Sequence, residues 1–392
     1  MGVFAREEYL ERVAKTKKSM QEKGVDVLVV VDPANMNYLI GYDGWSFYVH
    51  QALLVGVDKE EPVWIGRGMD ANGCRITSFL KNENIYEYAD DYVQSLVKHP
   101  MDFVADIIKK YGWENKNIGV EMDQYYFTAQ AYLSLTKNLP NATFKDATSL
   151  VNWVRVVKSP AELEFMRRAG KIAINVIEAA RTHIQVGVRE CDAASEIVRA
   201  QYAGTPEFGG DYPSIVPLIM PGEATKTPHL TWSDKPFVKD EAVLLELSGV
   251  YKHYHCPIAR TIFLGDKAPK LMTDTAKVVI DGLQETLDFI KPGVTAEEIE
   301  ARWREAIAAS GVVKESRLGY SIGVNYPPDW GEHTISFRPG DKTVMQPNMA
   351  VHLIPGIWHD DVGFEIDASF QITENGIEHF FEYPYEIMYN RY

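Results

Sequence analysis

The sequence predicts two domains, an α/β domain followed by an α+β domain that contains the same unit twice. The chain has 392 residues, which is enough for two domains of ordinary size. Strand-like and helix-like segments alternate through the first part of the chain, as they do in α/β domains. The second part repeats its own pattern after a shift of 106 residues, which predicts a pseudo-twofold α+β domain.

The N-terminal domain is expected to begin with a helix over residues 5–23, because Tyr9, Val13 and Met20 lie at helical spacing among charged residues. Gly24 would end this helix. The same reasoning predicts the remaining elements: a helix start at Asp32 and Pro33, strands over residues 25–31, 53–57, 62–65 and 118–122, and helices over residues 100–111 and 125–139.

A helix signature indicates the boundary between the domains. Ser159, Pro160 and Glu162 have the types and spacing of an N-cap, a proline at the first helical position and a capping-box glutamate. A long helix is expected to start there. We therefore assign residues 1–157 to the N-terminal domain and residues 158–392 to the second domain.

Each copy of the repeat reads as a helix, a turn, a second helix and then β-rich sequence. Gly187 and Gly293 mark the turns, and each is followed by a valine. Second helices are expected over residues 190–200 and 296–308. The other matched positions are Lys171 with Lys277, Ile172 with Val278, Ile174 with Ile280, Ile177 with Leu283, and Ile184 with Ile290. Two such units would bury their helices against one continuous sheet.

The composition disfavours several classes of function. A formal net charge of −15 disfavours nucleic acid and anionic membranes as partners. No apolar run approaches the roughly 20 residues of a membrane helix, and the charged N-terminus is not a secretory signal. The three cysteines are widely spaced and form no metal or redox motif, which fits a reducing compartment. We expect a cytoplasmic protein.

A single carboxylate interrupts an apolar run in the second domain. Residues 242–245 are apolar, Glu246 follows, and Leu247 resumes the run. Such runs are typical of strands buried on both faces, where an unpaired carboxylate is costly. Glu246 is therefore the first candidate for a catalytic residue. The alternative is a structural role, in which Glu246 faces solvent from an edge strand or is neutralised by Lys252 or Arg260.

The motifs around Glu246 resemble a known family, that of creatinase, prolidase and methionine aminopeptidase, which has the pita-bread fold. The motifs are His229, seventeen residues before Glu246, then Gly249-x-Tyr251-x-x-Tyr254, then Ala259-Arg260-Thr261. The resemblance implies a creatinase-type N-terminal domain and a pita-bread C-terminal domain. It also implies a homodimer in which the N-terminal domain of one subunit completes the active site of the other.

Metal-dependent members of this family bind two metal ions through two Asp, one His and two Glu residues. The corresponding positions here are Glu246, Pro257, Tyr320, Ile354 and Asp367. Proline, isoleucine and neutral tyrosine do not replace oxygen and imidazole ligands. The resemblance therefore implies the fold without the metals, as in creatinase, and we expect no metal and no cofactor.

An alternative metal site would use other histidines. His253 and His255 would share one face of a strand and could form a ligand pair. His352 and His359 are further candidates, but no spacing fixes a third ligand.

The resemblance also implies roles for the polar residues. His229 stands at the position of the family's catalytic histidine and would shuttle protons near neutral pH. Glu246 would act as nucleophile or as the partner of an amidinium group, with Asp367 as the second carboxylate. Glu365 stands two residues before Asp367, so in a strand both side chains would share one face.

Within the family, residues 37–48, 91–94 and 99–101 are similar to the ectoine hydrolase branch. The branch implies ring opening of ectoine, a small zwitterionic cyclic amidine, or of hydroxyectoine. The product from ectoine would be N-acetyl-2,4-diaminobutyrate. Carboxylates suit an amidinium, which is planar and cationic. The expected substrate-binding residues are Tyr320, Glu365, Arg260 and Arg338, with Trp45, Phe47 and Tyr48 closing the pocket of the partner subunit.

Other functions remain open at this point. A metal-dependent Xaa-Pro aminopeptidase or prolidase is the nearest enzymatic alternative, and a dimethylsulfoniopropionate lyase of the same fold is another. A non-catalytic binding module, as in a histone chaperone of this fold, is a third. The sequence also leaves open which ring C–N bond breaks, and whether Glu246 attacks covalently or activates water.

Overall fold

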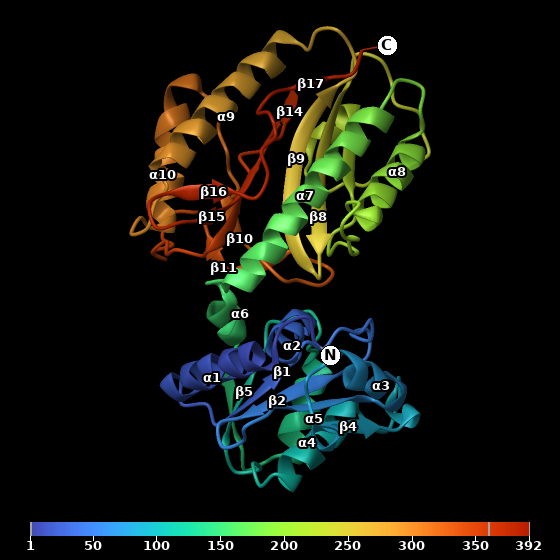
Figure 1. Ribbon diagram of the computed structural model, residues 1–392, viewed down its shortest axis with the longest axis vertical. Helices are drawn as coiled ribbons and strands as arrows, with labels where there is room; N and C mark the ends of the chain where they lie inside the picture. The colour runs from blue at the N-terminus through green and yellow to red at the C-terminus, as the bar shows by residue number, and fades with distance from the viewer. Residues whose placement is uncertain (1, 360, 392) are drawn as a thin grey trace. The chain divides into compact units, whose positions relative to one another are not determined.

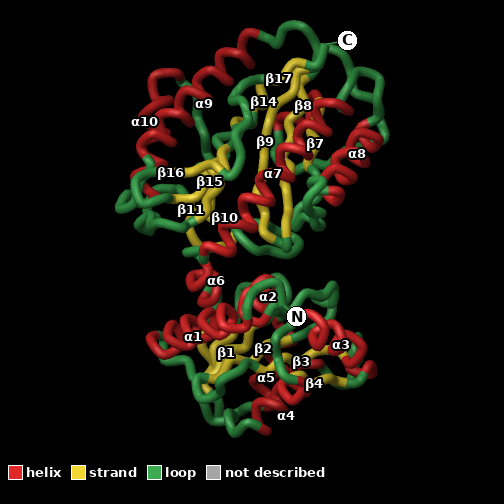
Figure 2. The backbone as a smooth tube through the Cα atoms, viewed as in Figure 1, coloured by secondary structure: helices red, strands yellow, loops and turns green. Residues whose placement is uncertain are grey.

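The computed structural model describes residues 2–359 and 361–391 of the chain. Two compact units are present, Met1–Arg155 and Val156–Tyr392, and each is described by itself (Figure 1, Figure 2). The first unit ends two residues before the boundary that the helix signature predicts. Among the described residues, no helix combines the length and the apolar character that a membrane span requires.

Unit 1 is built on one six-stranded sheet. Its strands are β1 (Val27–Val30), β2 (Ala52–Gly56), β3 (Val63–Arg67), β4 (Ile85–Tyr88), β5 (Asn117–Val120) and β6 (Thr143–Asp146), and its helices are α1 (Arg6–Glu22), α2 (Pro33–Ile40), α3 (Gly68–Thr77), α4 (Pro100–Lys110), α5 (Ala129–Asn138) and α6 (Leu150–Arg155). The strands lie in the order β4-β3-β2-β1-β5-β6, with β1 antiparallel to β2 and parallel to β5. Helices α4 and α5 pack Val104 and Leu135 into the core of this unit.

Local sequence signals explain where several of these elements begin and end. The Asp32 carboxylate accepts a hydrogen bond from the Ala34 N–H at 2.8 Å and caps α2, as the sequence predicts. The predicted helix over residues 5–23 is confirmed as α1. The helix predicted from residue 125 begins only at Ala129, because Thr128 accepts the Ala131 N–H and caps it there.

Four elements of unit 1 were not predicted from the sequence, namely α3, β4, β6 and α6. Strand β6 has the sequence Thr-Phe-Lys-Asp and is largely accessible to solvent at the edge of the sheet. An edge strand of this kind needs no apolar run, so the pattern that reveals buried strands is missing.

Unit 2 contains two main sheets and two pairs of helices. Its strands are β7 (Leu218–Pro221), β8 (Ala242–Tyr251), β9 (Tyr254–Phe263), β10 (Gly319–Ile322), β11 (Gly331–Ser336), β12 (Ala350–Leu353), β13 (Ile357–His359), β14 (Val362–Phe364), β15 (Ala368–Ile372), β16 (Ile377–His379) and β17 (Met388–Tyr389), and its helices are α7 (Pro160–His183), α8 (Glu190–Ala203), α9 (Lys270–Phe289) and α10 (Ala296–Ile307). Four short 3₁₀ helices complete the chain: η1 (Asn82–Asn84), η2 (Asp90–Tyr92), η3 (Gly222–Lys226) and η4 (Ala308–Ser310).

The expectation of one continuous sheet in this domain is wrong. The strands form one sheet in the order β17-β9-β8-β7 and another in the order β11-β10-β12-β15-β16. Side chains bridge β9 and the second sheet: the Ser369 hydroxyl of β15 donates to the Pro257 carbonyl at 2.8 Å, and the Thr261 hydroxyl donates to the carbonyl of Glu365, just before β15, at 2.9 Å. Pro257 has no N–H, so it cannot donate a backbone hydrogen bond to β15.

The internal repeat is confirmed. Helices α7 and α8 form the first copy, and α9 and α10 form the second. Gly187 and Gly293 both adopt the left-handed conformation, with φ of 84° and 93°, which glycine tolerates without strain. Ile184 and Ile290 are both buried just before these turns. The matched positions therefore mark equivalent turns in two helix pairs.

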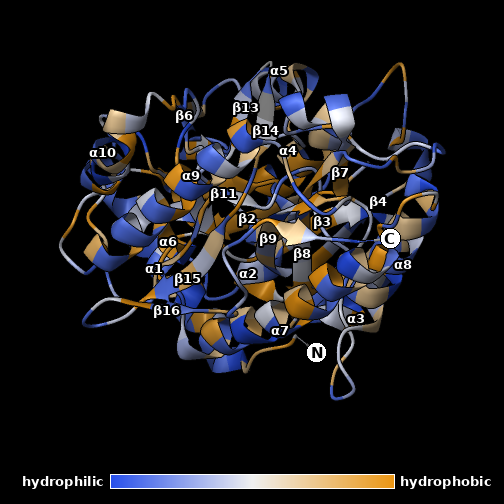
Figure 3. Cartoon of the chain, turned by 90° about the horizontal axis from the view of Figure 1, so that it is seen from above, coloured by the Kyte–Doolittle hydropathy of each residue, from blue (hydrophilic) through white to orange (hydrophobic). Residues whose placement is uncertain are grey.

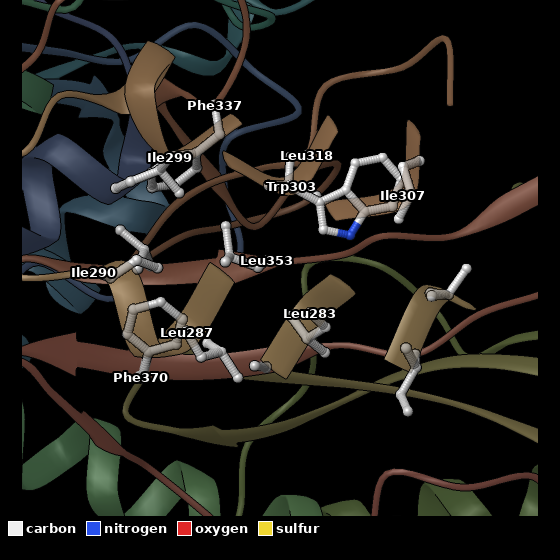
Figure 4. Close-up of a cluster of buried hydrophobic side chains, with 14 of the residues drawn as sticks. Leu283, Leu287, Ile290, Ile299, Trp303, Ile307, Leu318, Phe337, Leu353 and Phe370 are labelled. Carbon is white, nitrogen blue, oxygen red and sulfur yellow. The ribbon is translucent and has the colours of Figure 1, made fainter. Parts of the chain in front are cut away.

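The core of the second copy lies between its helices and the five-stranded sheet. Figure 4 shows Leu283 and Leu287 of α9 and Trp303 of α10 in the same cluster as Leu353 and Phe370 of the sheet. Hydrophobic and hydrophilic residues alternate along helices such as α7 and α10 (Figure 3), as expected for helices that cover a sheet with one face.

The Gly249 of the family-like motif is explained by helix packing. Helix α7 lies against β8 (Figure 1), and a Cβ atom on Gly249 would stand 2.0 Å from the Ala169 carbonyl oxygen and 2.3 Å from the Ala173 nitrogen. Both atoms belong to the backbone of α7, so neither can rotate away.

Replacing Gly249 with alanine should lower the free energy of unfolding by about 1–3 kcal/mol, because the helix must move off the strand. Urea unfolding would measure the loss. Gly73→Ala is the control, because Gly73 lies in α3 with open space around its Cβ position. That change should be neutral or stabilising by up to about 1 kcal/mol. A Gly249→Ala protein as stable as the Gly73→Ala protein would contradict this packing.

Candidate active site

Three carboxylates come together in the interior of unit 2. Glu246 lies in β8, and Glu365 and Asp367 lie in the segment that joins β14 to β15. All three side chains are buried. The predicted clustering is supported by the pKa of Glu365, which the charges of both Glu246 and Asp367 raise.

Glu246 does not face solvent from an edge strand. Strand β8 lies between β9 and β7, and Glu246 pairs with Ala259 on one side and with Leu218 on the other. Burial, together with the negative charges of Asp367 and Asp329, raises the pKa of Glu246 to about 8, and Lys314 opposes this shift. Burial and the neighbouring carboxylates also raise the pKa of Glu365 well above its ordinary value. The carboxylate cluster therefore favours the binding of a positively charged group.

Lys314 is a buried cation whose charge acts on Glu246 and Glu365, and it was not predicted from the sequence. Its ammonium group donates to the Ser316 hydroxyl at 2.9 Å and to the Gly356 carbonyl at 3.0 Å. Burial lowers the pKa of Lys314 to about 8, and the carboxylates of Glu365 and Glu246 oppose this shift. Lys314 lies in an irregular segment before β10, where neither periodicity nor spacing marks it.

Lys252 and Arg260 do not neutralise Glu246, as the structural alternative required. Lys252 is exposed in the turn between β8 and β9. Arg260 is fully buried and pairs with Asp367 instead, with 2.5 Å between its Nη1 and the Asp367 Oδ1. His352 stands on the other side, with its Nδ1 3.2 Å from the Asp367 Oδ2. Asp367 is thereby held in place from two directions.

The prediction that Arg260 binds the substrate's carboxylate is wrong, because protein acceptors already surround its guanidinium group. Besides Asp367, it donates to the carbonyls of Ala259, Tyr383 and Pro384 at 2.7 to 3.3 Å. Arg260 therefore positions Asp367. The C-terminal segment supplies two of these carbonyls, so that segment supports the site.

Tyr320 lies beside the cluster as a hydrogen-bonding group. Its hydroxyl accepts a hydrogen bond from the Trp330 indole N–H at 2.8 Å. Burial and the charge of Glu246 raise the pKa of Tyr320 well above its ordinary value, so the hydroxyl keeps its proton and can donate it. The guanidinium of Arg317 stands over the Tyr320 ring, 4.3 Å from its centre. Arg317 is thus a basic residue at the site that the sequence analysis did not identify.

The structure does not bring His229 or Arg338 to this cluster. His229 is exposed on the segment between η3 and β8. Arg338 is exposed after β11, and its Nε donates to the Ser336 hydroxyl at 2.7 Å. Over residues 2–359 and 361–391, no hydrogen bond or ion pair joins either side chain to Glu246, Glu365 or Asp367. The shuttle role of His229 and the substrate-binding role of Arg338 stay predictions.

The predicted aromatic residues of unit 1 lie on its surface. Trp45 and Tyr48 are 58% and 68% exposed, and the Phe47 ring packs between Trp45 and Tyr126. A small cavity of about 210 Å³ lies next to them and is lined by Tyr48, His50, Tyr92, Gln94, Lys98 and His99. Exposed aromatic side chains of this size often mark a contact surface.

The fold and the carboxylate cluster together define a class, that of hydrolases with a creatinase-type N-terminal domain and a pita-bread domain. Residues 12–157 match the creatinase/prolidase N-terminal domain, and residues 164–374 match metallopeptidase family M24. The chain belongs to family M24, and it is a hydrolase.

Known proteins similar to this chain include enzymes of two kinds. The chain is 45% identical over 391 residues to the ectoine hydrolase of Halomonas elongata, and the match covers 98% of each chain. It is 25% identical over 335 residues to an Xaa-Pro dipeptidase of Pyrococcus horikoshii, covering 79% of this chain and 93% of the relative. The structure of the dipeptidase PepE from Mycobacterium ulcerans has a TM-score of 0.80 over 100% of both chains at 22% identity, which shows a shared fold alone.

The residues at the family's metal-binding positions do not fit two metal ions. Pro257 and Ile354 carry no donor atoms in their side chains, and the Tyr320 hydroxyl keeps its proton. Of the two remaining carboxylates, Asp367 is already paired with Arg260. Across the part of the chain that the structure describes, no group of three or more His, Cys, Asp or Glu side chains has a metal-holding arrangement.

The alternative ligand pair of His253 and His255 is wrong for a geometric reason. His253 lies in the turn between β8 and β9 with a φ of 63°, so the two side chains do not share a strand face. His255 uses its Nε2 to accept the Ser214 N–H, and its Nδ1 lies 2.8 Å from the His253 carbonyl. Of the other two candidates, His352 pairs with Asp367, and His359 contacts the Val313 carbonyl.

Arg260→Met should lower the free energy of unfolding by about 3–5 kcal/mol, because it leaves the buried Asp367 carboxylate without its guanidinium partner. Arg302→Met is the matched control, since it breaks an exposed pair with Glu285 of similar length, and it should cost less than about 1 kcal/mol. Urea unfolding of both variants gives the comparison. Equal small losses would show that the buried pair does not hold the site together.

Proposed function

We propose that this chain hydrolyses the ring of ectoine, giving N-acetyl-2,4-diaminobutyrate, without a metal ion. The observation that carries the proposal is the excess of buried carboxylates over cations at Glu246, Glu365 and Asp367. An amidinium would supply the missing positive charge, and its planar N–H groups match carboxylate oxygens in bidentate fashion. The similarity to the ectoine hydrolase of Halomonas elongata supports the choice among amidines.

Glu246 is the residue that starts the reaction. Its ionised carboxylate either attacks the amidine carbon or removes a proton from the water that attacks there. The oxygen that ends on this carbon comes from water, one ring C–N bond breaks, and the departing nitrogen takes up a proton. The bound amidinium is positive, so it favours the ionised form of Glu246 and lowers its pKa from the value of about 8 in the free protein.

The other residues of the cluster hold charge and orientation. Arg260 and His352 hold Asp367 in place. Like Glu246, Asp367 faces the positive charge of the bound amidinium and stabilises this cation before the attack. The positive charge of Lys314 offsets the negative charge of Glu365, which limits the net charge of the buried site. The Tyr320 hydroxyl donates a hydrogen bond to the reacting end of the substrate, and Arg317 is the basic residue we assign to the substrate's carboxylate.

Purified protein should open the ring of ectoine at an undiminished rate in the presence of a strong chelator, because no step uses a metal. Glu246→Gln should reduce kcat at least about 100-fold, whereas the surface change Glu285→Gln should not. The ratio kcat/KM should rise with pH up to about 8, because only ionised Glu246 reacts. Product formation is followed by NMR.

Loss of the activity in chelator would contradict metal independence. Cleavage of Xaa-Pro peptides without ectoine turnover would replace the proposal by the dipeptidase function of the Pyrococcus horikoshii relative. Hydroxyectoine is tested as a second substrate in the same assay, and the two hydrolysis rates show which compatible solute the protein prefers.

We also propose that the chain works as a homodimer in which Trp45, Phe47 and Tyr48 of each subunit close the active site of the other. The exposure of Trp45 and Tyr48 supports this, since large aromatic side chains on a surface favour burial against a partner. The contact would exclude water from a charged reaction site.

Coexpression of two inactive variants tests this arrangement. One subunit carries Glu246→Gln, and the other carries Trp45→Ala with Tyr48→Ala. A mixed dimer then has one site with both parts intact, so activity should return although each variant alone is inactive. A mixture that stays inactive, or a monomer with full activity, would rule out closure by the partner.

A further inference from the structure

A large bulge interrupts β11 opposite the strand that carries Tyr320. Strand β11 pairs with β10 at Ser336 opposite Tyr320 and at Gly331 opposite Ile322, so three extra residues lie on the β11 side between these pairs. Bulges of this kind turn a side chain away from its regular direction. His333 lies inside the bulge, opposite the strand that carries Tyr320.

The backbone of His333 is strained. Its φ is 55°, in the left-handed region, which is uncommon for residues other than glycine, although histidine, asparagine and aspartate adopt it more often than the rest. Such a conformation costs about 1 kcal/mol or more and is most often kept at functional sites. The fold therefore holds this histidine at some cost in stability.

A partly buried aspartate, Asp329, orients the His333 ring. The Nε2 of His333 lies 2.9 Å from the Asp329 Oδ2, and the Asp329 Oδ1 accepts the Gly331 N–H at 2.9 Å. Burial alone would raise the pKa of Asp329, but the hydrogen bonds from His333 and Gly331 and the charges of His333 and Arg317 hold it below its ordinary value. Asp329 is therefore an anion that can stabilise an imidazolium, as in other Asp–His pairs.

The same aspartate connects His333 with the carboxylate cluster. The charge of Asp329 acts on Glu246 and on Tyr320. The next residue, Trp330, donates its indole N–H to the Tyr320 hydroxyl. His333 itself is 46% exposed, so its ring meets solvent on one side and the aspartate on the other.

We propose that His333, oriented by Asp329, is the general acid that protonates the ring nitrogen as the C–N bond of the amidine breaks. The inference rests on the proposed function and names the proton donor of that reaction. The imidazolium gives its proton to the departing nitrogen and becomes neutral. It regains a proton from the water that Glu246 activates or from solvent, so the protons balance over one turnover. His229, exposed and without such an anionic partner in the described structure, is the competing assignment.

The pH dependence of His333 depends on the charges around Asp329. Asp329 stabilises the protonated ring through its 2.9 Å contact, the charge of Arg317 acts on Asp329, and the charge of Asp329 acts on Glu246. Asp329→Asn removes the anion, so the ring loses its proton at a lower pH. The alkaline limb of kcat/KM should then move to lower pH in this variant.

The test compares His333→Gln, His229→Gln and the distant control His183→Gln in ectoine hydrolysis. His333→Gln should lower kcat about 100-fold or more with little change in KM, and it should remove the alkaline limb of the pH profile. His183→Gln should behave as wild type. In His333→Gly, which the left-handed backbone accepts without strain, added imidazole should restore part of the rate.

The outcomes separate this inference from the proposed function. Wild-type hydrolysis of ectoine together with an unchanged rate and pH profile in His333→Gln would overturn the role of His333 alone. A large loss in His229→Gln but not in His333→Gln would return the proton transfer to His229. No hydrolysis by the wild-type protein would overturn the proposed function and this inference together.

Discussion

The ion pair between Arg260 and Asp367 is the interaction on which the rest of the candidate site depends. A carboxylate buried at this depth needs a partner, and the guanidinium of Arg260 supplies one and fixes Asp367 in position. The C-terminal segment supports the pair, because the Tyr383 and Pro384 carbonyls accept hydrogen bonds from Arg260. The far end of the chain thus determines the geometry of a residue in the middle of the domain.

The negative charge that remains after this pairing determines which kind of ligand the site favours. Glu246 and Glu365 share Lys314 as a buried cation, so the interior is short of positive charge. Within family M24, metal ions usually supply that charge, but here Pro257 and Ile354 remove the ligands that would hold them. A cationic substrate is the simplest remaining source of positive charge. The lack of donor atoms at Pro257 and Ile354 and the proposed amidinium substrate therefore have one electrostatic explanation.

Several features could be predicted from the sequence because they depend on neighbouring residues alone. The capping residues Ser159 and Glu162 fix the start of α7, and both copies of the repeat show the same glycine turn. Glu246 was identified because a charge inside an apolar run is visible without any tertiary information. Its burial in the centre of a sheet follows from the same run.

Other features depend on contacts between distant segments. No periodicity or spacing in the sequence marks Lys314 or His333. Only the fold brings Lys314 near the carboxylates, and only the bulge in β11 sets the direction of the His333 side chain. Arg260 was expected to bind the substrate because a basic residue must meet the substrate's carboxylate, yet several of its acceptors come from residues more than a hundred positions away, namely Asp367, Tyr383 and Pro384. The division of the expected sheet into two also depends on a long-range effect, the meeting of β9 and β15 at Pro257.

The sequence by itself determined the two-domain architecture, the repeat, the position of the main carboxylate and the residue types at the family's metal-binding positions. These properties depend on residue type, on spacing and on local hydrogen bonding. The tertiary structure alone decided which cation pairs with which carboxylate and which histidine contacts Asp329. The physical reason is that charge interactions in a buried site depend on distance in space, and distances between segments this far apart in the chain are set only when the sheets and helices pack.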